Sequence, residues 1–190
     1  MVGKLRTARA KHEASHAVLA RKFGLRVECV DARSDNPNVT QASAAYAVKG
    51  EDLAAQIAGY EKDAIVALAG NEANRRDYPD LRVYDMITEN EDADTINARS
   101  AIYQIACLTS GQPMPQGPGS MSADQVMVGQ MYEIFFRLRR ETVALVARHW
   151  PAIERVAKHL ERHGRIDAQC QLDELIERAE RMALLSDSPR

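Results

Sequence analysis

Two histidines four positions apart, with a glutamate directly after the first, are the residues of this sequence with the clearest chemistry. The segment reads His12, Glu13, Ala14, Ser15 and His16. On a helix, side chains four positions apart project from the same face, so both imidazoles can reach one metal ion at about 2.0 to 2.1 Å. The glutamate then lies beside the coordination position left for water, whose proton it can accept. The spacing predicts a zinc site with His12 and His16 as ligands and Glu13 as catalytic base.

Two ligands do not complete such a site, because a catalytic zinc ion normally has three protein ligands. Three fixed letters in five positions also arise by chance, and the three side chains are then ordinary solvated helix residues. The neighbours favour the metal site, since Ala14 and Ser15 are small and leave room for close helix packing and an ion. A third ligand must come from elsewhere in the chain.

The motif lies in a predicted helix that is followed by a predicted ribbon. No proline or glycine interrupts residues 5–23, apolar residues recur there at helical spacing, and Gly24 ends the helix. Residues 25–31 and 39–48 then have the alternating, β-branched character of strands, with the turn SDNPN at residues 34–38 between them. These segments predict a small antiparallel β ribbon.

The rest of the chain reads mainly as helix. An interruption near Gly59 stays open, Asp94 stands at or just before the first turn of its helix, and Asp167 is a predicted N-cap. The proline- and glycine-rich residues 110–120 are a predicted loop. The predicted helices are residues 51–75, a segment that starts at Asp94, residues 124–149, residues 151–163 and a last segment after Asp167.

Composition excludes several classes of partner. The chain has 190 residues, 45% of them hydrophobic, which suits one sizeable core. Its 25 basic and 27 acidic residues nearly balance, so no global field favours nucleic acid or a membrane surface. The apolar runs are too short to cross a bilayer, and we expect a cytoplasmic protein of undetermined oligomeric state. Cys29, Cys107 and Cys170 are expected to be reduced and mostly buried.

Three segments resemble the FtsH-type zinc peptidases. HEASHAV at residues 12–18 resembles their HEAGHAL, and IVALAGNEANRR at residues 65–76 resembles the helix that they write as LGGRAAEEL. ADTINARSAI at residues 93–102 is similar to their NDLERATEIA, whose aspartate is the third zinc ligand. The segments occur in the order of the family, and the resemblance is clearest over residues 8–106.

The resemblance implies Asp94 as the third ligand. Aligning Asp94 with the aspartate of the family places five apolar residues on its apolar positions, whereas aligning Asp92 places polar residues there. Asp92 and Glu91 stay as alternatives. The five apolar residues are Ala98, Ala101, Ile102, Ile105 and Ala106.

The chain departs from the family at several points. Ser15 stands where the family has glycine, and Asn71 and Asn74 replace the arginine and the first glutamate of GRAAEE. The sequence contains no G-x-x-x-x-G-K-[ST] phosphate loop, whereas the membrane-bound relatives unfold substrates with an attached ATPase. The resemblance therefore implies a stand-alone, HExxH-type zinc metalloendopeptidase. It would hydrolyse unfolded or exposed polypeptide segments without ATP, or work with a separate protein partner.

These observations predict a mainly α (α+β) fold, which the resemblance makes zincin-like, with a small antiparallel ribbon and a C-terminal helical segment. Residues 1–109 form the expected peptidase-like core, residues 121–185 the helices that pack on it, and residues 186–190 a frayed tail. The alternative function is a non-catalytic helical module that keeps the metal for stability and binds a partner through its C-terminal helices.

A second histidine pair, His159 and His163, also has a spacing of four. The pair lies in the last turn before Gly164, where the helix dipole favours a partly protonated imidazole. The pair could bind a metal, but a second metal site there is the less favoured interpretation.

Overall fold

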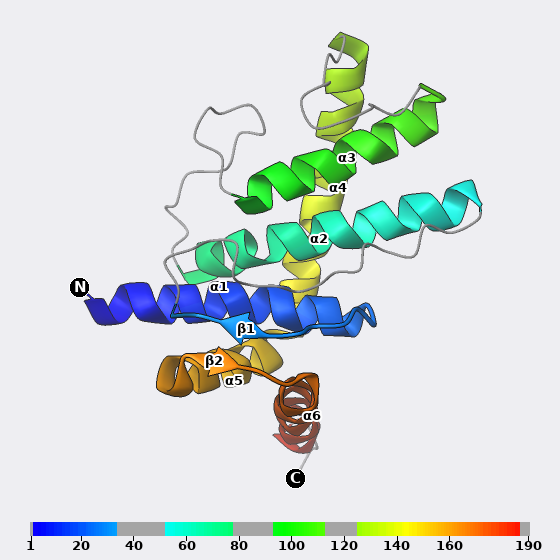
Figure 1. The fold of residues 1–190 in the computed structure, drawn as a ribbon. Helices are drawn as coiled ribbons and strands as arrows, with labels where there is room; N and C mark the ends of the chain where they lie inside the picture. The colour runs from blue at the N-terminus through cyan, green and yellow to red at the C-terminus, as the bar shows by residue number, and fades with distance from the viewer. Residues whose placement is uncertain (1, 34–51, 78–92, 113–124, 187–190) are drawn as a thin grey trace.

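The computed structural model describes residues 2–33, 52–77, 93–112 and 125–186, and this part of the chain is an assembly of six helices with one two-stranded ribbon (Figure 1). The predicted fold class, mainly α with a small antiparallel sheet, is confirmed. In chain order the elements are α1 (Val2–Lys22), β1 (Val30–Asp31), α2 (Leu53–Asp77), α3 (Ala93–Ser110), α4 (Gln125–Arg148), α5 (Trp150–His163), β2 (Arg165–Ile166) and α6 (Gln169–Ser186).

Helix α1 lies at the centre of the assembly. It packs between α2 on one side and α5 on the other, α3 covers the far side of α2, and α4 crosses behind α2 and α3 (Figure 1). Ala10, Ala14 and Ala17 of α1 are fully buried. Their small side chains let neighbouring helices come close to the backbone of α1. The helix that carries both histidines is thus held from two sides.

The ends of α2 and α3 follow local signals. Asp52 caps α2, since its Oδ1 accepts the backbone N–H of Ala55 at 2.7 Å. The interruption left open near Gly59 is absent, because α2 runs through this buried glycine as one helix. Helix α3 ends at Ser110, where the predicted loop begins, and Gly111 has a φ of +69°. Residues 113–120 of that loop lie outside the described residues.

Proline and glycine mark the ends of α5. Pro151 occupies the start of the helix, and Gly164 closes it in the left-handed conformation with its N–H on the carbonyl of Leu160. The predicted N-cap at Asp167 is wrong: α6 begins only at Gln169, and the Asp167 carboxylate accepts from Arg165, while the carbonyl of Ala168 accepts the N–H groups of Gln171 and Leu172. The Asp167 carboxylate therefore pairs with the guanidinium of Arg165, two positions away, and does not cap the N-terminus of α6.

The ribbon joins segments that are far apart in the chain. Strand β1 pairs antiparallel with β2, with Val30 opposite Ile166 and Asp31 opposite Arg165. The strand predicted over residues 25–31 is shorter than expected, because β2 pairs only with the last two residues of this segment. Pairing with β2 is not predicted from the sequence, and the predicted partner, residues 39–48, lies outside the described residues.

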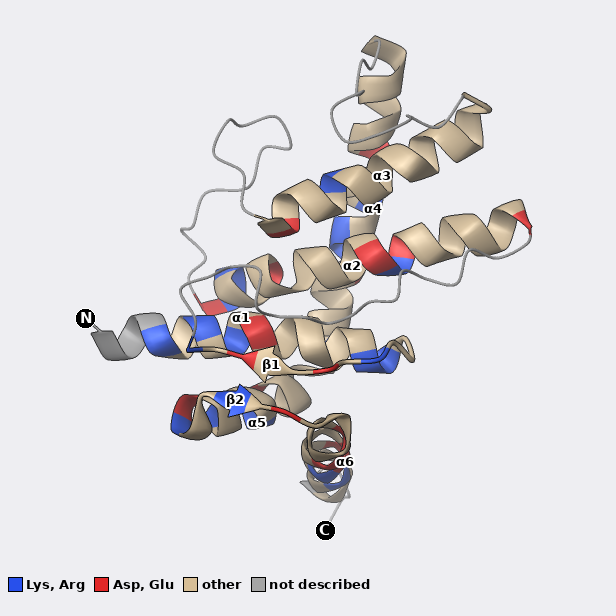
Figure 2. Ribbon diagram, viewed as in Figure 1, with Lys and Arg blue, Asp and Glu red and all other residues tan. Residues whose placement is uncertain are grey.

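Charged residues of both signs are spread over the described helices (Figure 2). No helix in the described ranges is both long and apolar enough to cross a membrane. The three cysteines are free, but only Cys107 is buried, while Cys29 is half-buried and Cys170 exposed. The expectation that most of them are buried is therefore wrong.

Candidate metal centre

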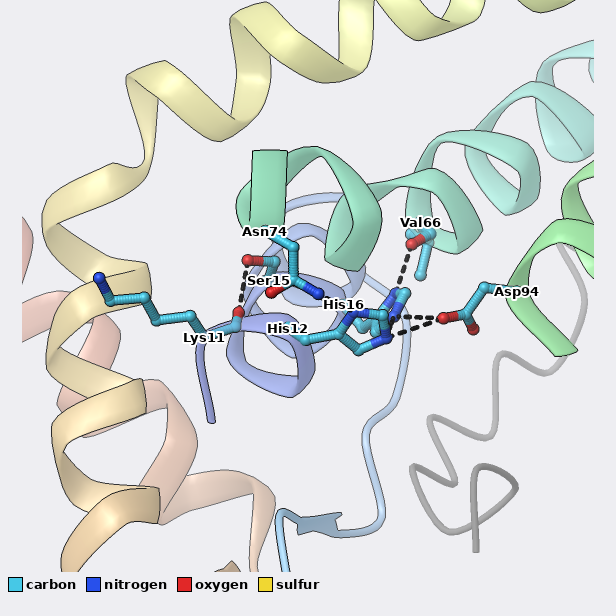
Figure 3. Close-up of polar contacts among 7 residues, drawn as sticks. All are labelled: Lys11, His12, Ser15, His16, Val66, Asn74 and Asp94. Atoms are coloured by element: carbon cyan, nitrogen blue, oxygen red, sulfur yellow. Dashed lines mark hydrogen bonds and ion pairs between the residues drawn. The ribbon is translucent and has the colours of Figure 1, made fainter. Parts of the chain in front are cut away.

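Two imidazoles and one carboxylate converge where α1, α2 and α3 meet (Figure 3). His12 and His16 project from one face of α1, and Asp94 lies in the first turn of α3. Oδ2 of Asp94 is 2.8 Å from Nε2 of His12 and 3.1 Å from Nε2 of His16. The structure thus brings together all three residues that the sequence suggested as metal ligands.

The spacing of these three atoms suits a metal ion. A tetrahedral zinc ion with ligands at about 2.0 Å holds any two of them about 3.3 Å apart. The two Nε2 atoms are 3.1 Å apart, and their distances to Oδ2 of Asp94 are 2.8 and 3.1 Å. Small outward movements of the side chains would therefore fit the three donors around one ion. Two imidazole nitrogens and one carboxylate oxygen are also a donor set that zinc accepts.

Helix α2 contacts the opposite edge of both imidazoles. The carbonyl oxygen of Val66 is 2.6 Å from Nδ1 of His16, and the side chain of Asn74 is 3.2 Å from Nδ1 of His12. A backbone carbonyl can only accept, so it holds the proton of neutral His16 on Nδ1 and leaves a lone pair on Nε2. The two Nε2 atoms consequently point toward Asp94 and toward each other.

Gly70 leaves room for the imidazoles. It lies on α2 midway between Val66 and Asn74, and a Cβ atom at this position would be 2.5 Å from Nε2 of His16 and 2.6 Å from Cε1 and Nδ1 of His12. Contacts this short cannot exist, so any larger residue would displace the rings. The absence of a side chain here is a condition for the arrangement of His12 and His16.

The charges at the site favour a cation. Burial lowers the pKa of His16, but the carboxylates of Asp94 and Glu13 and the carbonyl of Val66 outweigh it and raise this pKa to about 9. Burial likewise raises the pKa of Asp94, but His16 and His12 outweigh it and hold this pKa far below its usual range. A positive charge among these groups, whether a proton or a metal ion, is stabilised.

Glu13 is buried beside the ligands. Its side chain belongs to the same turn of α1, only 7% of the residue is exposed, and it is the one acidic residue among the several basic residues of this helix. Burial raises the pKa of Glu13, and the nearby His16 and His12 partly offset this effect. A carboxylate with a raised pKa is a stronger base than one in water.

Ser15 fits the helix packing. The residue is fully buried, and its hydroxyl donates to the carbonyl of Lys11 one turn earlier at 2.7 Å. The extra polar group that distinguishes it from the glycine of the FtsH-type motif is therefore satisfied within α1.

A charge cluster around a buried glutamate joins α2 to α4. Glu72, whose side chain is 4% exposed, pairs with Arg75 on its own helix and with Nε of Arg139 on α4 at 2.8 Å. Breaking a buried pair of this kind leaves a charge without compensation, which disfavours rotation of α2. The cluster thereby keeps Gly70 and Asn74 against the histidines.

Within the described residues, no further candidate from the sequence joins this site. Asp92 and Glu91 lie outside the described residues. His159 and His163 stack with ring centroids 4.4 Å apart, and Nε2 of His159 lies near the Gln171 side chain. In the described ranges, no third potential ligand accompanies this pair.

Sequence reasoning missed the contribution of α2. Val66, Gly70 and Asn74 follow each other at intervals of four, so they share one face of the helix. That spacing was visible, but nothing in it indicates that the face meets two imidazoles.

Comparison with known proteins adds no assignment: no family model matches the chain, and no curated protein matches it.

Proposed function

We propose that the protein is a zinc-dependent peptidase whose Zn²⁺ ion is held by His12, His16 and Asp94. The observation that carries this proposal is the position of the Asp94 carboxylate, which contacts both Nε2 atoms of the HExxH histidines from another helix. Three protein donors leave one position of a tetrahedral site for solvent, as in catalytic rather than structural zinc sites.

We propose Glu13 as the general base. Zinc in such a site acts as a Lewis acid that activates water near neutral pH and polarises a carbonyl group. The Glu13 carboxylate accepts the proton of the attacking water and then delivers it to the nitrogen of the leaving amine. Its burial beside His12 and His16 supports this role, because burial raises the pKa of Glu13 and so makes its carboxylate a stronger base.

The substrate class depends on the resemblance to the FtsH-type peptidases. We propose unfolded or exposed polypeptide segments as substrates, cleaved without ATP by this chain alone or delivered by a separate protein. In this proposal an extended substrate would add to the edge of the strand predicted over residues 39–48, which lie outside the described residues.

A second candidate function is a metal-stabilised binding module. The three ligands come from α1 and α3, so a bound ion would cross-link these helices whether or not catalysis occurs. Phe136 and Val143, about half exposed on α4, are apolar side chains that a protein partner could cover.

Replacing Glu13 by glutamine separates the two functions. The variant should keep its zinc but lose cleavage of casein by at least about 100-fold, the contribution expected of a general base. Glu28, an exposed glutamate outside the site, provides the matched control, because Glu28→Gln should cleave like the wild type. A zinc-loaded wild type that cleaves no unfolded protein would favour the module.

A further inference from the structure

Asn74 is placed to act on His12. It lies on the face of α2 that also carries Val66 and Gly70, and its side chain extends toward the imidazole (Figure 3). Its Nδ2 is 3.2 Å from Nδ1 of His12, whereas its Oδ1 is buried and has no hydrogen-bond partner among the described residues. A buried amide oxygen without a partner costs free energy. In this orientation, therefore, a hydrogen bond stabilises only the nitrogen end of the amide.

The orientation of the amide is linked to the tautomer of His12. Nδ2 donates, so in this orientation Nδ1 of His12 accepts and the ring proton resides on Nε2. A metal at Nε2 requires the lone pair of that atom, and neutral His12 must then carry its proton on Nδ1. The Nδ1–H group needs an acceptor, and Oδ1 of Asn74 becomes one when the amide rotates by half a turn about Cβ–Cγ.

We propose that Asn74 is a positioning residue of the metal centre: its amide rotates to accept the Nδ1–H of His12 and so presents Nε2 to the ion. The inference rests on the proposed zinc site. His16 needs no such side chain, because the backbone carbonyl of Val66 sets its tautomer. His12 is therefore the ligand whose orientation depends on a replaceable side chain.

Zinc affinity measured against a chromophoric chelator tests this role. Asn74→Leu has a similar shape but no acceptor, and it should weaken zinc binding about 10- to 100-fold, the usual effect of losing a partner of a metal-bound histidine. Asn74→Asp keeps an acceptor and should bind zinc at least as tightly as the wild type. The matched control is Asn71→Leu, because buried Asn71 lies on the same helix but lines a small hollow with Leu68 and Phe135. It should not change the affinity.

Nitrogen-15 NMR of the histidine rings supplies a readout that a merely structural role would not change. In the zinc-loaded wild type, the His12 ring should show a protonated Nδ1 whose hydrogen exchanges slowly with water. In Asn74→Leu this hydrogen should exchange rapidly, while the corresponding signal of His16 stays as in the wild type.

The outcomes distinguish this inference from the proposed function. A wild type that binds no zinc overturns both. A wild type that binds zinc, together with a folded Asn74→Leu variant within about threefold of its affinity, overturns the role of Asn74 alone. If Asn74→Leu does not fold, Asn74→Asp decides, because a tenfold loss of affinity in a variant that keeps the acceptor contradicts the proposal.

Discussion

Nε2 of His12 lies 2.8 Å from Oδ2 of Asp94, although 82 positions separate the two residues in the chain. The contact joins α1 to α3. Helix α2 contacts the opposite edge of the neighbouring His16 ring through the carbonyl of Val66. A carboxylate delivered to two imidazoles from a different helix is more specific than the histidine pair alone, because it requires the tertiary fold.

Asp94→Ala should reduce zinc affinity by more than about 100-fold, because it removes a ligand rather than a partner of a ligand. Asp92→Ala, two positions earlier, should leave the affinity within a few fold of the wild type. Chelator competition on protein purified without a histidine tag measures both. The opposite order would show that Asp92 is the ligand and that the register of α3 in the site is wrong.

Zinc should also stabilise the fold. Because the proposed ligands belong to α1 and α3, the ion should bind only when both helices are in place, and a 100-fold excess of free zinc over its dissociation constant should then stabilise the native state by about 2.7 kcal/mol. Thermal unfolding should therefore shift to higher temperature with zinc and back with a chelator. Asp94→Ala is the control, and an equal shift in that variant would place the metal elsewhere.

The register of α3 could be predicted because a helix with one buried face leaves its own pattern in the sequence. The five residues placed on the apolar face of this helix are all buried: Ala98, Ala101, Ile102, Ile105 and Ala106. A spacing of three to four residues is local information, and it places Asp94 in the first turn without knowledge of the rest of the fold. That Asp94 binds a metal remains a prediction.

The contacts of α2 and the ribbon depend on information that no local pattern carries. Strands β1 and β2 have two residues each, too few to show alternation, so the pairing of Val30 with Ile166 leaves no signal. Gly70 sits inside a helix, where glycine is ordinarily unfavourable, but the sequence does not tell which groups approach it. Only the packing of α1 on α2 shows that two imidazoles do.

Gly70→Ala tests that close approach. Alanine favours a helix over glycine by about 1 kcal/mol, so a substitution without a clash would stabilise α2. Here the new Cβ would lie within 2.6 Å of both imidazoles, and we expect weaker zinc binding by at least about tenfold, with no gain in stability.

The control for this test is Gly129→Ala on α4, where a Cβ would meet no atom of the described residues within 4 Å. It should raise the free energy of unfolding by up to about 1 kcal/mol and leave zinc binding unchanged. Wild-type zinc affinity in Gly70→Ala would show that the rings do not need the space that glycine provides.

Asp31 should make the stability of the ribbon dependent on pH. Burial raises the pKa of Asp31, but the backbone N–H of Arg33 at 2.8 Å, the Arg33 guanidinium and Arg165 outweigh it and lower this pKa overall. A lowered pKa in the folded state means that the ionised carboxylate stabilises the fold above its unfolded-state pKa of about 3.9, and that this contribution is lost as the pH falls through the lower folded-state value.

Asp31→Asn should therefore destabilise the protein by about 1 kcal/mol near pH 7, a low value for charged hydrogen bonds because the Arg33 side chain is largely exposed to solvent. The difference from the wild type should be constant between about pH 7 and 5 and should narrow below about pH 4. Denaturant unfolding at several pH values measures it. Asp167→Asn, which removes an exposed carboxylate that also pairs with an arginine, is the control and should have little effect at any pH. A difference for Asp31→Asn that persists unchanged at pH 3 would mean that the amide disturbs packing, and that ionisation of Asp31 does not stabilise the ribbon.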